Sequence, residues 1–240
     1  MNIIEMKNVS VEYEDGFKAL EDVSLNIEDG DFVFIIGSTG SGKSTLLKLL
    51  YKDINATEGV IRVDGDDLAL MKKNEIPYLR RKLGIVFQDY KLLPQKNLYE
   101  NLAFVLRAVG CERKEIKKRI YAALEEVDLT HRIDALPAQM SGGEQQRAAI
   151  ARALINSPKV LLADEPTGNL DPDTSLEIMK LLVGINQILG MTMLVATHDR
   201  TLVDMVKQHV IQLDGGHIVR DEYNARYDGT ENWGLADEEK

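Results

Sequence analysis

Eight residues beginning at Gly37 constrain the fold of this chain more than any other feature. They follow the pattern glycine, any four residues, glycine, lysine, serine, and they are Gly37, Ser38, Thr39, Gly40, Ser41, Gly42, Lys43 and Ser44. Glycines let a backbone turn back on itself, so that successive N–H groups converge on phosphate oxygens. The pattern follows an almost wholly apolar run, Phe32–Ile36, and precedes a helical pattern from Thr45. This context favours a phosphate-binding loop between a strand and a helix over a flexible Gly/Ser loop.

Two side chains of this loop have predicted tasks. We expect Lys43 to reach the β- and γ-phosphates of a nucleotide and the Ser44 hydroxyl to bind Mg²⁺. The residues from Thr45 onwards begin a helix, so the phosphates would also meet a helix N-terminus.

The rest of the pattern predicts an α/β fold of the P-loop NTPase type. Apolar runs at 32–36, 160–163 and 193–196 are typical of strands buried on both faces in a parallel sheet. Alternating segments at 23–27 and 59–65 indicate an additional antiparallel β part. Residues 95–156 have helical spacing instead, with Lys117, Lys118 and Arg119 on a solvated helix face or at a site for an acidic partner.

These patterns define the expected domain organisation. We expect a nucleotide-binding core from residues 1–94 and 157–220, a helical subdomain at 95–156, and a mobile acidic tail at 221–240. Together, residues 1–220 would form one domain with a mixed sheet core.

A second acidic element follows the apolar run that ends at Ala163. Asp164 and Glu165 stand at the carboxyl end of a predicted parallel strand, where ligands bind in open α/β sheets. Asp164 is suited to hold Mg²⁺, and Glu165 could accept a proton from an attacking water. Alone, the pair could also be a polar exit from a strand.

The composition limits which classes of partner and which cellular compartment fit the chain. The 240 residues carry a formal net charge of −10, which argues against a nucleic-acid binder held by a basic surface. The single cysteine, Cys111, fits a reducing compartment. No apolar run reaches the roughly 18–20 residues of a membrane span, and the start at Met1 has no basic or long apolar leader. We therefore expect a cytoplasmic protein.

One further motif carries a family resemblance. The run from Met140 to Arg147 resembles the signature of the ATP-binding cassette (ABC) ATPases, and it lies upstream of Asp164 as in that family. The resemblance implies that Ser141, Gly142, Gly143 and Glu144 address the γ-phosphate of ATP bound to a second copy, in an ATP-dependent homodimer. Ser141 and Glu144 also form a capping box that opens a helix, and both interpretations can hold.

The resemblance assigns further residues in chain order. Tyr13 matches the aromatic residue that stacks on adenine, although an edge-strand tyrosine remains an alternative. Gln88 matches the glutamine that contacts Mg²⁺ and the attacking water. Asp171 lies in the loop that crosses the dimer interface, and His198 matches the switch histidine at the γ-phosphate, although a histidine at a strand end can also be structural. Catalysis would then rest on Glu165, His198 and Gln88, and metal binding on Ser44, Gln88 and Asp164.

Residues 75–101 resemble the cell-division branch of the family. The resemblance implies a permease-like integral membrane partner at the cytoplasmic face, through which the ATPase controls peptidoglycan hydrolases. Docking would fall near Gln88–Asn101, where Tyr90, Leu92 and Leu93 supply apolar surface unless they are buried in the domain. Lipoprotein-release and MacB-type export ATPases are alternatives, as is a nucleotide-dependent scaffold that recruits other division proteins. A GTPase is disfavoured because the Asn-Lys-x-Asp motif is missing.

Overall fold

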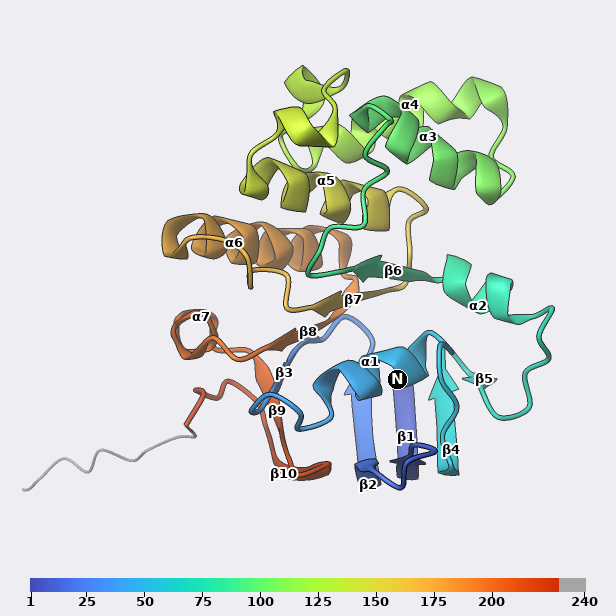
Figure 1. The fold of residues 1–240 in the computed structure, drawn as a ribbon, viewed down its shortest axis with the longest axis vertical. Helices are drawn as coiled ribbons and strands as arrows, with labels where there is room; N and C mark the ends of the chain where they lie inside the picture. The colour runs from blue at the N-terminus through green and yellow to red at the C-terminus, as the bar shows by residue number, and fades with distance from the viewer. Residues whose placement is uncertain (229–240) are drawn as a thin grey trace, which may run out of the picture.

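The computed structural model of the chain describes residues 1–228, and it places two sheets beneath a group of helices (Figure 1). The strands are β1 (Asn2–Glu12), β2 (Lys18–Glu28), β3 (Phe32–Ile36), β4 (Glu58–Val63), β5 (Asp66–Asp67), β6 (Leu83–Val86), β7 (Val160–Asp164), β8 (Thr192–Thr197), β9 (His209–Asp214) and β10 (His217–Glu222). The helices are α1 (Lys43–Leu50), α2 (Ile76–Arg81), α3 (Leu98–Ala108), α4 (Arg113–Glu125), α5 (Gly142–Leu154), α6 (Pro172–Leu189) and α7 (Arg200–Val206), with short 3₁₀ turns at Thr130–Arg132 and Pro137–Gln139.

The antiparallel sheet has the strand order β2-β1-β4-β5. Burial along β2 alternates residue by residue over most of the strand, as expected for a sheet with one face on a core and one in water. The strand pattern at 23–27 thus lies within β2, and the one at 59–65 covers most of β4.

The second sheet has the order β10-β9-β3-β8-β7-β6, with the strands from β9 to β6 parallel and β10 antiparallel to β9. Successive side chains of a strand point to opposite faces, so β3 serves two cores. Phe32, Phe34 and Ile36 pack with the helices α3 to α6, whereas Val33 and Ile35 pack with α1 and the antiparallel sheet. The sheet is therefore buried on both faces, which explains the unbroken apolar run of its strands.

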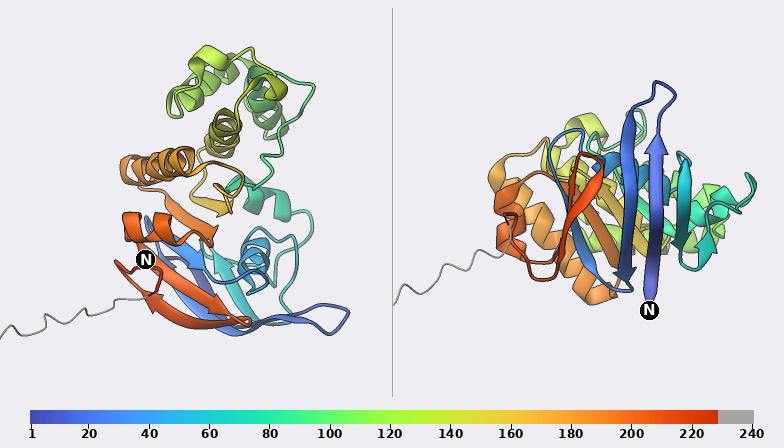
Figure 2. Two further views of the ribbon diagram at one scale, coloured as in Figure 1. Left: turned by 60° about the vertical axis from the view of Figure 1, so that its left-hand side comes forward. Right: turned by 90° about the horizontal axis from the view of Figure 1, so that it is seen from below.

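Residues 95–156 hold α3, α4, the two 3₁₀ turns and α5, and no strand. Figure 1 and the left view of Figure 2 both place α3 and α4 farthest from the antiparallel sheet, with α5 and α6 between them and the parallel strands. The buried side chains of α4 and α5 belong to the same core cluster as one face of the parallel sheet. This packing fixes α5 relative to the strand ends that carry the predicted site.

The C-terminal segment departs from the sequence-based expectation. β10 runs to Glu222, so the boundary expected at residue 220 falls inside a strand. Ala225 is fully buried and donates its backbone N–H to Gln208 O at 3.1 Å, and Tyr227 N donates to Asp204 Oδ1 at 2.7 Å. The expectation of a mobile tail is therefore wrong for residues 221–228, and the remainder, 229–240, lies outside the described residues. Across residues 1–228, no helix is long and apolar enough to cross a membrane.

Candidate active site at the carboxyl ends of the parallel strands

Four neighbouring strands of the parallel sheet end beside one another, and each is followed by predicted site residues. The phosphate-binding loop follows β3, His198 follows β8, and Gln88 follows β6. Asp164 is the last residue of β7, and Glu165 comes directly after it. Because β3, β8, β7 and β6 are adjacent in that order, the fold brings these residues to one edge of the sheet.

Two glycines of the loop occupy backbone positions that other residues could not take. Gly37 has a φ of 146°, and a Cβ there would lie 2.2 Å from Leu213 O. Gly42 has a φ of 109° at the N-cap of α1, and a Cβ there would lie 2.6 Å from Ala19 O. Both clashes are with backbone, which cannot give way, so the tight turn requires glycine at these two positions.

Lys43 is the first residue of α1 and is only 5% exposed. Its Nζ donates to the carbonyl oxygens of Gly37 at 2.8 Å and Ser38 at 2.9 Å, so the ammonium group sits inside the curve of the loop. Burial lowers the pKa of Lys43, and the charges of Glu165 and Asp164 act in the opposite direction. A phosphate in the loop would stabilise the charged form in the same way.

Ser44 and Asp164 form a pair of hard oxygen donors next to this lysine. The Ser44 hydroxyl donates to Asp164 Oδ1 at 3.0 Å. Burial raises the pKa of Asp164, and the nearby charge of Glu165 adds to this, while the Ser44 bond opposes it. A cation at this point would stabilise the carboxylate. Hydroxyl and carboxylate oxygens suit Mg²⁺, which usually needs only one or two protein ligands beside substrate phosphates.

Glu165 is held in an unusual backbone conformation. Its φ is 47°, a left-handed value that costs a non-glycine residue about 1–3 kcal/mol and is concentrated at functional sites. The backbone N–H of Glu165 donates to Ala196 O at 3.0 Å, which anchors the turn to β8. The side chain then lies beside His198, whose Nδ1 is 3.1 Å from Glu165 Oε1.

The side chains of Gln88 and Glu165 both lie beside Gly168, a glycine that sequence reasoning did not single out. A Cβ on Gly168 would lie 3.0 Å from Gln88 Nε2 and 3.4 Å from Glu165 Oε2. Asn169 fixes the backbone on the other side, because its Nδ2 donates to Gln88 O at 3.0 Å. Because Gly168 has no side chain, it leaves room for the Gln88 amide and the Glu165 carboxylate. Its only signal in the sequence is its position three residues after Glu165.

Tyr13, the residue predicted to stack on adenine, lies near the phosphate loop. Its hydroxyl is 3.3 Å from the Thr45 hydroxyl, and its ring is parallel to that of Phe17, with centroids 6.4 Å apart. Tyr13 is 38% exposed and Phe17 is 54% exposed. Two exposed aromatic rings at the loop offer a surface for a nucleobase. Phe17 is a second residue that the motif analysis missed.

The signature residues Ser141, Gly142, Gly143 and Glu144 line a separate hollow of about 350 Å³ together with Asp171 and Thr174. The capping box is present, since Ser141 N donates to Glu144 Oε2 at 2.7 Å and Glu144 N donates to Ser141 Oγ at 3.2 Å. Asp171 caps α6 by accepting from Thr174 N at 3.0 Å and from Thr174 Oγ1 at 2.6 Å, and these bonds lower its pKa.

Within one chain, the phosphate-binding loop before α1 and the signature residues at the start of α5 lie apart from each other. The buried leucines of α1 pack against one face of the parallel sheet, and the buried alanines of α5 pack against the other. None of the loop residues 37–45 lines the hollow at the start of α5. One copy therefore brings Lys43, Asp164, Glu165, Gln88 and His198 together, but it does not bring Ser141 to them.

The apolar residues expected to dock a partner are partly covered by the domain itself. Tyr90, Leu92 and Leu93 are all half-buried, and Leu92 packs against the main core. Asn101 holds the backbone of Leu93 by accepting from its N–H at 2.7 Å. For Leu92, the alternative of ordinary burial in the domain is the one that the structure supports.

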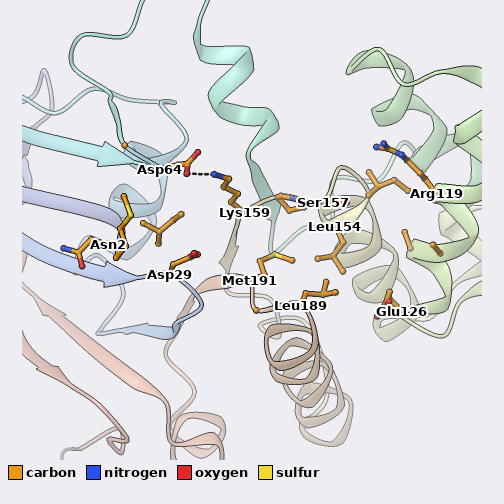
Figure 3. A pocket seen from close by; sticks show the side chains of 18 residues that line it. Asn2, Asp29, Asp64, Arg119, Glu126, Leu154, Ser157, Lys159, Leu189 and Met191 are labelled. Carbon is orange, nitrogen blue, oxygen red and sulfur yellow. Dashed lines mark hydrogen bonds and ion pairs between the residues drawn. The ribbon is translucent and has the colours of Figure 1, made fainter.

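A hollow of about 900 Å³ lies elsewhere, at the amino ends of β7 and β8 (Figure 3). Leu154, Leu189 and Met191 give it apolar walls, and Lys159 pairs with Asp64 across one side at 2.6 Å. The predicted nucleotide residues stand at the opposite ends of these strands and do not line it. Volume alone would therefore misplace the active site of this chain.

The comparisons with known proteins show the family of the chain. The model of the ABC transporter family matches residues 20–168. The chain belongs to this family and is an ABC ATPase, so both the family assignment and the predicted fold class are confirmed.

More particular likenesses follow. The cell division ATP-binding protein FtsE of Streptococcus pneumoniae (serotype 2, strain D39) is 48% identical over 227 residues, which are 95% of this chain and 98% of that protein. The dimeric post-hydrolysis structure of the ATP-binding cassette MJ0796, bound to ADP and Pi, is 37% identical with a TM-score of 0.83 and covers 93% of this chain and 100% of that one. CbiO1 from Clostridium perfringens, part of the ABC transporter complex cbiONQ, is 33% identical with a TM-score of 0.87, at 93% and 89% coverage. The chain is thus an FtsE-like cassette.

Proposed function

We propose that this chain is the ATP-hydrolysing subunit of an FtsE–FtsX-type complex in cell division. Two copies close on two ATP molecules and reopen after hydrolysis, and an FtsX-like integral membrane protein transmits this movement to peptidoglycan hydrolases outside the membrane. The chain would then act at the cytoplasmic face of the membrane. The relatives named as cell division ATP-binding proteins support this function, because the likeness extends over nearly the whole of both chains.

The observation that carries the dimer is the separation of α1 and α5 on opposite faces of the sheet. A γ-phosphate held by Lys43 of one copy can meet the amino end of α5 only if that helix comes from a second copy. The likeness to a dimeric cassette bound to ADP and Pi supports the same arrangement. Free N–H groups at the start of a helix are suited to bind an anion.

Each predicted site residue then has a role in ATP binding or hydrolysis. Gly37–Thr45 bind the phosphates, Tyr13 stacks on the base, and Ser44, Asp164 and Gln88 hold Mg²⁺, which neutralises phosphate charge when it is bound. Glu165 accepts the proton of the attacking water, with His198 and Gln88 orienting the carboxylate and the water. Ser141–Glu144 and Asp171 complete the site from the other copy.

The substitution Ser141→Arg tests the dimer. A large cation at the start of α5 should block ATP-dependent dimerisation, while ATP affinity of the monomer changes less than about twofold, because the motif acts on the other copy. Light scattering with Mg-ATP and nucleotide titration by fluorescence would measure the two quantities. An equal loss of monomer affinity would mean that the motif acts on its own nucleotide, and the proposed dimer would be wrong.

The membrane partner needs a separate experiment. The tagged chain, crosslinked in cells and purified from detergent-solubilised membranes, should recover an FtsX-like protein. Recovery of a lipoprotein-release or MacB-type permease instead would contradict the cell-division function.

A further inference from the structure

The first turn of α5 carries a negative charge at the point where the proposed dimer needs room for a phosphate. Glu144 stands at the third position of the helix and accepts from the Ser141 N–H at 2.7 Å, so its carboxylate caps the helix end. The cap stabilises α5, because it pairs a backbone donor that the helix leaves free. The same charge would repel an incoming γ-phosphate, since like charges several ångströms apart interact strongly in a partly desolvated interface.

Arg132 is the cation that faces this carboxylate. Its Nε lies 2.9 Å from Glu144 Oε1, and its Nη2 donates to Glu144 Oε2 at 3.3 Å, so the guanidinium group meets both oxygens. The same Nη2 donates to the backbone oxygen of Gln139, just before the signature. Both side chains are partly buried, at 32% and 27% exposure, which strengthens their attraction relative to a pair in open water.

The surrounding segment holds Arg132 in place. Leu129, the residue before the 3₁₀ turn Thr130–Arg132, is buried in the main core, and Arg132 N donates to its oxygen at 3.0 Å. The Ser141 N–H bond is the largest cause of the lowered pKa of Glu144, and the charge of Arg132 acts in the same direction. These two contacts therefore favour the ionised carboxylate.

The other charged residues lining this hollow make contacts that do not involve Glu144. Arg147 pairs with Glu177 at 3.1 Å and donates to Val127 O at 3.5 Å, and Asp171 caps α6. Within residues 1–228, Arg132 is the residue that forms an ion pair with Glu144.

We propose that Arg132 is a positioning residue of the ATP-closed dimer, which neutralises Glu144 so that this carboxylate caps α5 without repelling the γ-phosphate held by the other copy. Arg132 acts through Glu144, and it does not touch the nucleotide of its own chain. The inference rests on the proposed function, because it requires that α5 meets the nucleotide of a second copy.

A double-substitution cycle separates charge compensation from simple packing. The parent of this cycle carries Glu165→Gln, so that hydrolysis cannot reopen the dimer during the measurement. Arg132→Gln is introduced into this parent and into the same parent with Glu144→Gln, and the protein concentration for half-maximal dimerisation with Mg-ATP is measured by analytical ultracentrifugation. In the parent, Arg132→Gln should weaken dimerisation about tenfold or more. In the Glu144→Gln background, where the repelling charge is gone and the amide can still cap, the same change should cost less than about twofold. A purely structural role of Arg132 would give the same loss in both backgrounds, which would overturn the proposal.

Two further variants serve as controls for this double-substitution cycle. Arg132→Lys keeps the charge and loses the fork, so dimerisation should stay within about threefold of the parent; a loss as large as that of Arg132→Gln would contradict charge compensation. Arg119→Gln removes an arginine on α4 that lines the distant hollow, and it should leave dimerisation unchanged. If Ser141→Arg blocks dimerisation while Arg132→Gln does not weaken it, this inference fails and the proposed function stands. If the parent itself does not dimerise with Mg-ATP, both fail.

Discussion

His198 and Glu165 face each other from the ends of two adjacent parallel strands, with His198 Nδ1 3.1 Å from Glu165 Oε1. The other carboxylate oxygen, Oε2, lies on the side of Gly168 and the Gln88 amide. One oxygen is thus oriented by the histidine, while the other faces the residue predicted to hold the attacking water. A carboxylate fixed in this way is suited to act as a positioned base.

Glu165→Gln should therefore separate ATP binding from hydrolysis. The amide keeps the size and the hydrogen-bonding reach of the side chain but cannot accept the proton. Turnover should fall about 10²-fold or more, which is the usual contribution of a positioned base. The ATP-bound dimer should accumulate, because the closed state can no longer leave by hydrolysis.

A phosphate-release assay beside size-exclusion chromatography with Mg-ATP measures both effects. His198→Ala is the companion variant, since it should also slow turnover while Glu165 remains. Hydrolysis at the parent rate by the Glu165→Gln protein would show that this residue is not the base.

Lys43→Ala tests the phosphate loop. The variant removes a buried cation that the loop carbonyls of Gly37 and Ser38 hold in place, so ATP affinity should fall about tenfold or more. The fold should survive, because the lysine is costly to bury and does not contribute to the apolar core. Nucleotide titration and thermal melting without nucleotide would check the two parts, and unchanged affinity in a normally folded variant would contradict the assignment.

The place of the predicted site residues at one edge of the sheet could be inferred from the sequence, because the signals are local. Gly37–Ser44 form one short run, and Asp164 and Glu165 stand at the end of an apolar strand of the kind found in parallel sheets. The role predicted for His198 came only from the resemblance to the ABC ATPases. Sequence alone could not show that Arg132 meets Glu144, since that contact depends on how the 3₁₀ turn packs beside α5.

The prediction of a mobile C-terminal segment also failed for a physical reason. Composition from residue 221 onwards is acidic, which predicts solvation. Tertiary contacts override it: Arg220 Nη2 donates to Tyr227 O at 2.6 Å, and Arg200 pairs with Asp228 at 3.0 Å. Two basic side chains that stand before the segment thus hold it against the body.

Asp164→Asn should raise the thermal stability of the nucleotide-free protein and weaken its binding of Mg²⁺. Burial raises the pKa of Asp164, so the ionised form destabilises the folded state at high pH. The asparagine avoids that charge and can still accept from Ser44. Without nucleotide, its melting temperature should exceed that of the parent at about pH 8, and the difference should shrink as the pH falls through the raised pKa of Asp164 in the folded parent.

Thermal melts at several pH values, and ATP titrations with and without Mg²⁺, would test this prediction. The Mg²⁺ dependence of ATP binding should weaken in the variant, because one anionic ligand is lost. A melting temperature below that of the parent at high pH would mean that Asp164 is stabilised by its neighbours and not penalised by burial.

Gly168→Ala tests whether the space beside Gln88 matters for catalysis. The added Cβ would lie 3.0 Å from Gln88 Nε2, so this flexible side chain must move by a few tenths of an ångström, while the backbone of Gly168 has no positive φ that would resist the change. Small displacements of groups that position a reactant are costly, so kcat should fall about tenfold while ATP affinity and the melting temperature change little. Gly184→Ala is the matched control, because a Cβ on this α6 glycine meets nothing within 4 Å and an alanine there should stabilise the helix by about 0.5–1 kcal/mol. Steady-state kinetics on both variants would decide the question: full turnover by the Gly168→Ala protein would mean that the position of the Gln88 amide does not limit hydrolysis.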